Sequence, residues 1–320
     1  MPLPPFPIRT LRAAAPAFLL ACAALRPAAD GAIVVYDGFN YGGSNGALNG
    51  KSGGGELGLA GSWLNNGEAG TSNYLATGLT FSDIPVFGGM AELANSTGNI
   101  TGAVRPIGVD AAGTLWGSYL FRTVLDTSSA GNSLSAILMG PTQTMNDQTS
   151  WFDIEANQFS NALGAVHVAG ERATFFGNAP TVGVTHLLAF KLENLGFAGN
   201  QTASAWMLTA GQYDNFKPGG ITESELNSAA TGTGNSQVLG RITKTVNPAE
   251  VGRGTGTFTS SDFLRLFNYN NVTTDFDEIK ISNGSLNEAI TVPEPSAGAL
   301  VLVGLLLGMR RYGTRNAFPE

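Results

Sequence analysis

The sequence predicts an all-β protein, with short strands packed as a sandwich in one domain. Charged residues make up only 13% of the 320 residues, about half of the usual share, and there are 43 glycines. A composition poor in Glu and Lys and rich in Gly, Ser, Thr and Asn suits strands and turns better than a helical bundle. The hydrophobic share of 43% is ample for a core, which argues against wholesale disorder.

Short apolar and β-branched runs alternate with turn clusters along the chain. In the clearest run, 114–125, Leu115, Tyr119 and Phe121 face one way and Trp116 faces the other. A strand that is apolar on both faces belongs in the middle of a two-layer structure. Further strands are predicted at 33–36, 89–94, 133–139, 150–156, 164–169, 185–193, 202–209, 237–243, 256–268 and 274–282.

Helices and repeats contribute little to the pattern. One short helix is predicted at 221–227, because Thr222 and Glu225 are spaced as a capping box. No repeat of convincing period is present, which argues against a propeller or a β-helix. Many short strands without such a repeat predict a β-sandwich or jelly roll.

Two motifs near the ends of the strand-rich region carry a family resemblance. Val35-Tyr-Asp-Gly-Phe-Asn-Tyr41, followed by a glycine-rich stretch and Gly61-Ser-Trp63, resembles the opening of concanavalin-like sandwich domains of exported bacterial proteins. Phe276-Asp-Glu-Ile-Lys-Ile281 resembles the closing strand of such domains. The resemblance implies a lectin- or glucanase-like (LamG-like) sandwich over residues 32–290, with polysaccharide as the expected partner.

Charge and cysteine content limit the classes of partner and of site. The net charge of −7, with no run of Lys or Arg, argues against a nucleic-acid surface. The only cysteine is Cys22, so an internal disulfide is excluded. Because Leu-Leu-Ala precedes Cys22, this stretch also loosely resembles a bacterial lipobox. Lipidation of Cys22 and a plain apolar role for it both stay open.

Residues 1–31 are predicted to be a signal peptide. Arg9 and Arg12 give it a positive start, and an apolar stretch follows at 13–25. This stretch is too short for an ordinary membrane span. The body of the chain is therefore expected to be exported.

The C-terminal segment 291–320 contains a proline-flanked acid, an apolar run and a basic end. These parts are Pro293, Glu294 and Pro295, then 297–309, then 310–315 with Arg310 and Arg311. Basic residues after an apolar run keep the C-terminus cytoplasmic by the positive-inside rule, which places the body outside. A helix over 297–309 would span about 20 Å, less than the hydrocarbon core of about 30 Å, which fits a transient anchor.

This order of parts resembles the PEP-CTERM sorting signal of bacteria that make exopolysaccharide. The resemblance implies recognition by an exosortase, a membrane transpeptidase-like enzyme, and then release to the cell surface or extracellular matrix. The chain departs from the family pattern after Arg311, where the remaining stretch is longer and less basic. The expected location is the inner membrane, transiently, and then the surface or the matrix.

The stretch from Trp151 to Glu155 is the candidate glycan-binding site. Concanavalin-like glucanases carry a Glu-x-Asp-x-Glu or similar strand, whose alternate residues share one face. Here Asp153 and Glu155 occupy the second and third positions, but Trp151 replaces the first carboxylate. A retaining mechanism needs two carboxylates, so a non-catalytic protein is predicted, with an exposed Trp151 stacking on a sugar ring. A buried Trp151 on an ordinary strand is one alternative, and a secreted glycoside hydrolase or lyase is another.

The remaining candidate groups are two histidines and three acids. His167 and His186 are expected to be structural, because neither has an acidic or histidine neighbour at ligand spacing. Asp275, Asp277 and Glu278 are weak candidates for calcium, which prefers hard oxygen ligands. The alternative is that these three acids are simply solvated. No other cofactor is predicted.

Overall fold

The computed structural model describes residues 32–53, 55–66, 70–94, 100–126, 134–143, 151–158, 162–176, 180–216, 221–229, 240–251, 256 and 258–291. They belong to one compact unit, which begins at Ala32. The expected signal peptide with Cys22, and the sorting segment from residue 292 onward, lie outside the described residues. None of the helices within the described ranges is long and apolar enough to cross a membrane.

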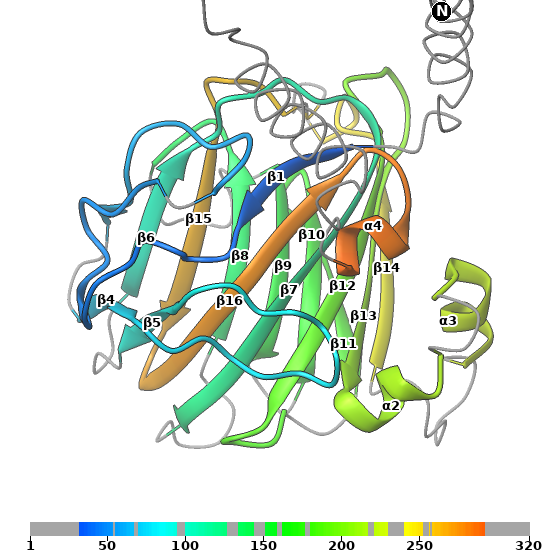
Figure 1. The fold of residues 1–320 in the computed structure, drawn as a ribbon. Helices are drawn as coiled ribbons and strands as arrows, with labels where there is room; N and C mark the ends of the chain where they lie inside the picture. The colour runs from blue at the N-terminus through cyan, green and yellow to red at the C-terminus, as the bar shows by residue number, and fades with distance from the viewer. Residues whose placement is uncertain are drawn as a thin grey trace, which may run out of the picture. The chain divides into compact units, whose positions relative to one another are not determined.

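The described strands form two antiparallel sheets, which confirms the predicted all-β sandwich (Figure 1). The nine-stranded sheet has the order β14 (Gly240–Val246), β13 (Gln201–Thr209), β12 (Thr185–Leu195), β7 (Gly113–Asp126), β16 (Val272–Ser282), β5 (Met90–Ala94), β4 (Thr71–Leu75) and β2 (Gly46–Ala47), and β1 (Ile33–Asp37) also pairs with β16. The seven-stranded sheet has the order β11 (Glu171–Phe176), β10 (Ala162–Val168), β9 (Phe152–Gln158), β8 (Leu134–Gly140), β15 (Phe263–Tyr269), β6 (Ile100–Pro106) and β3 (Leu64–Asn65).

Strand β7 has apolar side chains on both faces, as its sequence predicts. Leu115, Tyr119 and Phe121 belong to the main core between the two sheets. Trp116 and Leu120 belong to a second apolar cluster on the outer face of the nine-stranded sheet. Both sides of the strand are therefore packed, which explains why apolar residues occupy alternate positions on both faces.

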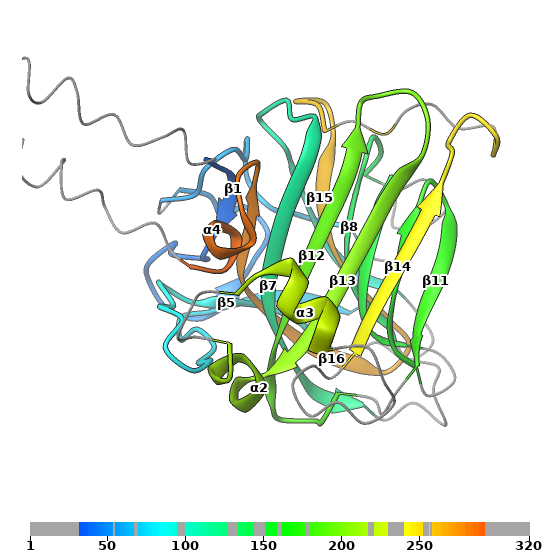
Figure 2. The same ribbon diagram turned by 90° about the vertical axis from the view of Figure 1, so that its right-hand side faces the viewer.

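Three short helices cover that outer face (Figure 2). They are α2 (Ala210–Asp214), α3 (Glu223–Ala229) and α4 (Leu286–Ile290). The predicted capping box is confirmed, because Glu225 N donates to Thr222 Oγ1 at 3.2 Å and Thr222 N donates to Glu225 Oε2 at 3.0 Å. The sequence prediction missed α2 and α4, each of which is only five residues long.

Asp37, in the opening motif, ties the two sheets together. Its carboxylate accepts hydrogen bonds from Trp63 Nε1 at 3.0 Å, Tyr41 Oη at 2.5 Å and Phe39 N at 2.8 Å. It also pairs at 3.1 Å with Arg105 Nη1, which comes from β6 in the other sheet. Phe39, Tyr41 and Trp63 of the opening motif therefore all donate hydrogen bonds to the buried carboxylate of Asp37.

Several strands differ from the prediction, and β4 and β11 were not predicted at all. The expected strand 256–268 begins late, at Phe263, because 259–262 form a turn in which Asp262 N donates to Thr259 O at 2.9 Å. Strand β6 was not predicted, since its Gly, Arg and Pro residues break the apolar alternation. Arg105 is nevertheless buried there, with Asp37 as its partner.

Candidate functional site

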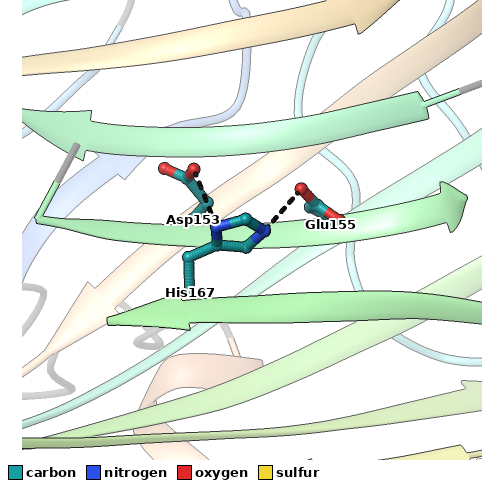
Figure 3. Close-up of side chains that lie close together, drawn as sticks. All are labelled: Asp153, Glu155 and His167. Carbon is teal, nitrogen blue, oxygen red and sulfur yellow. Dashed lines mark ion pairs between the residues drawn. The ribbon is translucent and has the colours of Figure 1, made fainter. Parts of the chain in front are cut away.

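The β9–β10 hairpin brings together two acids and a histidine. Its register pairs Asp153 with His167, and strand alternation gives Glu155 the same face as Asp153. Ile154 and Val166 point the other way, into the core between the sheets. The three polar side chains therefore lie on the outer face of the seven-stranded sheet (Figure 3).

The imidazole of His167 lies between the two carboxylates. Its Nε2 is 3.0 Å from Glu155 Oε1, and its Nδ1 is 4.0 Å from Asp153 Oδ2. All three side chains are buried, with Asp153 only 1% exposed. Burial alone would lower the pKa of His167, but the hydrogen bond to Glu155 and the two negative charges outweigh it and raise that pKa.

Two arginines flank the trio on the same face. The register pairs His167 with Arg172 of β11, whose Nη2 lies 3.3 Å from Glu155 Oε2. On the other side, Leu138 separates Asp153 from the fully buried Arg265 of β15. Burial lowers the pKa of Arg265, and the charge of Asp153 partly offsets this effect. The side chain of Arg172 is 36% exposed, so it connects the buried trio to solvent.

The trio could hold a divalent metal ion. One donor atom from each of Asp153, Glu155 and His167 lies within 4.8 Å of the other two. One imidazole nitrogen with two carboxylate oxygens suits a transition metal such as zinc or manganese better than calcium, which takes six to eight oxygens. Arg172 would then hold the second oxygen of Glu155 and orient this ligand.

His167 has two acidic neighbours that the sequence did not predict. It was expected to be structural because it has no acid at ligand spacing, but its acidic neighbours lie across a hairpin rather than along one strand. The available signal was the alternate pair of acids on the predicted strand 150–156, followed by a histidine on the next predicted strand, 164–169. His186 does have structural surroundings, since it is buried and stacks on Phe121 at 5.3 Å between ring centroids.

Trp151 lies at a bend just before β9, apart from the two acids. Its ring is half-buried and packs against the main core. Its backbone N donates to Met139 O at 2.8 Å and its carbonyl accepts from Ala169 N at 2.9 Å. Asp153 and Glu155 therefore lie together on the outer face of the sheet, whereas Trp151 packs on the core side.

The three calcium candidates each have partners of their own. Asp275 pairs with Arg122 Nη2 at 2.7 Å. Asp277 accepts a hydrogen bond at 2.8 Å from Leu79 N, and Glu278 accepts one at 2.8 Å from Phe87 N. Glu278 also lies 3.3 Å from Lys280 Nζ, at a β-bulge where its φ is 49°. None of these acids is solvated, since all are buried. Within the described residues, Asp153, Glu155 and His167 are the one group with metal-ligand spacing.

The chain matches no family model, and it matches no curated protein. Among solved structures it is similar to the globular domain of T. cruzi calreticulin, with a TM-score of 0.42 and 13% identity over 78% of this chain and 95% of that one. It is also similar to lectin II from Ulex europaeus, with a TM-score of 0.39 and 10% identity over 69% and 92%. A carbohydrate esterase from a Shiga toxin-encoding bacteriophage gives a TM-score of 0.36 and 14% identity over 70% and 90%. At such scores, the likenesses carry no argument about what this chain binds.

Proposed function

We propose that this chain is an exported, non-catalytic binding protein for polysaccharide, and that the outer face of the seven-stranded sheet is its binding surface. The proposal rests on one observation, which is that this face has an apolar half and a charged half side by side. Sugar-binding surfaces need this combination, because sugar rings offer both apolar faces and hydroxyl groups.

The apolar half centres on β15. Phe263, Phe267 and Tyr269 alternate with core residues along this strand and belong to a third apolar cluster, separate from the main core. Phe263 and Tyr269 are half-buried, whereas Phe267 is buried. The register connects the two halves directly, since Phe267 pairs with Ala136 and Ala136 pairs with Glu155.

The charged half would contribute in two ways. A metal ion on Asp153, Glu155 and His167 would fix the β9–β10 hairpin and keep the charged side chains in place. Arg172, which reaches solvent, would bind hydroxyl or carboxylate oxygens of the glycan. All three described helices cover the other sheet, so they leave this face free of described helices.

The rival function is a secreted glycoside hydrolase or lyase on the same fold. A retaining hydrolase needs a nucleophile and an acid on opposite sides of the scissile bond, about 5–5.5 Å apart. Here Trp151 replaces the first carboxylate of the glucanase strand motif, and the imidazole of His167 lies between Asp153 and Glu155. This arrangement favours binding over hydrolysis.

The proposal for location rests on the ends of the chain. The signal peptide 1–31 would export the body, and the segment 291–320 would anchor it transiently before an exosortase releases it to the surface or matrix. Deletion of residues 293–320 should turn a cell-associated protein into one secreted directly. Unchanged fractionation of the truncated protein between cells and medium would rule out this role of the segment.

A glycan array probed with the whole chain in detergent tests the binding function. Binding to at least one class of polysaccharide is expected, and chelation of divalent metal by EDTA should weaken it. The absence of binding to every glycan, with and without added manganese or zinc, would exclude the proposed function.

A further inference from the structure

Glu155 is shared between the imidazole of His167 and the guanidinium of Arg172. Its Oε1 lies 3.0 Å from His167 Nε2, and its Oε2 lies 3.3 Å from Arg172 Nη2. Without a metal ion, this carboxylate is therefore the counter-charge of Arg172. A divalent ion on Asp153, Glu155 and His167 would take up that negative charge. The positive charge of Arg172 would then be free for a ligand.

Arg172 is the charged group of the site that reaches solvent. Its side chain is 36% exposed, whereas Arg265 is fully buried. The charges of Asp153 and Asp262 lie close to Arg265, so its own charge is already balanced. A guanidinium presents five N–H donors in a planar fork that matches a carboxylate, and Glu155 is the one described side chain that pairs with this one. A ligand carboxylate gains more from such a group than a neutral hydroxyl does.

The charged and aromatic contacts of the face lie far apart, which sets the length of the ligand. Arg172 is on β11, and the half-buried Phe263 and Tyr269 are on β15. Strands β10, β9 and β8 lie between them. Four strand spacings of 4.7–4.9 Å give about 19 Å, which is much longer than one sugar ring. One ligand can therefore contact both ends only if it is an extended chain that crosses the strands.

We propose that the ligand is an acidic polysaccharide, and that Arg172 binds its carboxylates once a metal ion occupies the trio. This inference rests on the proposed function and names the ligand class of the same surface. In the metal-loaded protein, Arg172 binds a uronate carboxylate while rings of the same chain contact Phe263 and Tyr269. In the metal-free protein, Glu155 neutralises Arg172, and the uncompensated charge of Asp153 repels an anionic chain.

A glycan array with chemically matched pairs tests the ligand class. It carries neutral polysaccharides and uronate polysaccharides, and each uronate polymer is also present with its carboxylates reduced to alcohols. The whole chain in detergent is applied after loading with manganese and removal of free metal, and again after treatment with EDTA and gel filtration. For the manganese-loaded chain, reduction of the carboxylates should weaken binding by at least about tenfold, because hydrogen bonds between charged groups are lost. Monomeric galacturonic acid should not compete, because it cannot span the face.

Arg172→Gln should remove the preference for carboxylates, and Arg172→Lys should restore part of it. Arg241→Gln, which changes an exposed arginine of β14 in the other sheet, is the control and should bind as wild type does. Equal binding to the reduced polymers, a preference that EDTA does not change, or an unchanged preference in Arg172→Gln would overturn this inference and leave the proposed function standing. The absence of binding to every polysaccharide would instead refute the proposed function, and the inference with it.

Discussion

His167 Nε2 lies 3.0 Å from Glu155 Oε1, across the two strands of the β9–β10 hairpin. The contact depends on register, because His167 pairs directly with Asp153 and so lies diagonally opposite Glu155. A slip by one residue would turn one strand's polar side chains into the core. The trio is therefore a property of the folded hairpin, and variants of its members test whether it binds metal.

Replacement of His167 should abolish metal binding. Wild-type chain dialysed against manganese or zinc should retain about one ion per molecule, measured by mass spectrometry of the metal content. His167→Ala removes one of three ligands, and we expect affinity to fall by more than the roughly 10–100-fold typical of an outer-shell change. Asp83→Asn, an exposed acid elsewhere, should bind as wild type does. Equal metal content in His167→Ala would show that the trio is not a metal site.

The Asp37–Arg105 pair should contribute strongly to stability. Both side chains are buried, and Arg105→Met leaves the carboxylate of Asp37 without its counter-charge. Breaking a buried pair in this way costs about 3–5 kcal/mol, which urea denaturation can measure. The matched control is Lys244→Met, whose partially exposed pair with Glu171 at 3.6 Å should contribute less than about 1 kcal/mol. Similar losses in the two variants would contradict the role of Asp37 in joining the sheets.

Asp275 should make stability depend on pH in a predictable direction. Burial raises the pKa of Asp275 to about 6 from its ordinary value of 3.8, against the opposing effect of Arg122. Between pH 4 and 6 the folded state therefore binds the proton more tightly, and this group's contribution to stability falls as pH rises through that window. The shift corresponds to about 3 kcal/mol at 1.36 kcal/mol per pKa unit.

Asp275→Asn should remove this dependence. Urea denaturation at pH 4 and at pH 7 should show that the stability of wild type, relative to the variant, is higher at pH 4 by roughly that amount. Asp83→Asn controls for the loss of an exposed acid. A difference between wild type and Asp275→Asn that stays constant with pH would refute the raised pKa.

Gly117 should tolerate no side chain. It pairs with Phe190 between β7 and β12, and a Cβ atom at Gly117 would lie 2.0 Å from Phe190 Cζ. Gly117→Ala should therefore destabilise the fold by about 1–3 kcal/mol through overpacking, seen as a lower denaturation midpoint. Gly211→Ala, where a Cβ has open space, is the control. If both variants unfold at the same midpoint, Phe190 moves more easily than we expect.

The sequence predicts the elements whose signal is local. The two-faced pattern of β7 and the capping box of Thr222 and Glu225 depend on residues a few positions apart. Strand β6 was not predictable from periodicity, because Arg105 interrupts its pattern and is accommodated by distant partners, namely Asp37 from the other sheet and Glu56. Burial of such an arginine is a tertiary property, and no local pattern in the sequence reports it.

The candidate site was predictable in part. Alternation correctly placed Asp153 and Glu155 on one face, but Trp151 precedes the strand and its bend turns the ring toward the core. The contribution of His167 depends on the register of a hairpin whose turn lies between the two strands. Sequence spacing along one strand carries no information on that register.

We propose that the outer face of the seven-stranded sheet binds polysaccharide, and a matched pair of aromatic variants can test this claim. Tyr269 is half-buried on that face, whereas Phe197 is 55% exposed in the turn between β12 and β13. On a glycan array, wild type and Phe197→Ala should bind the same glycans equally, and Tyr269→Ala should lose most of the signal. Full binding by Tyr269→Ala, or loss of binding by Phe197→Ala instead, would contradict the claim.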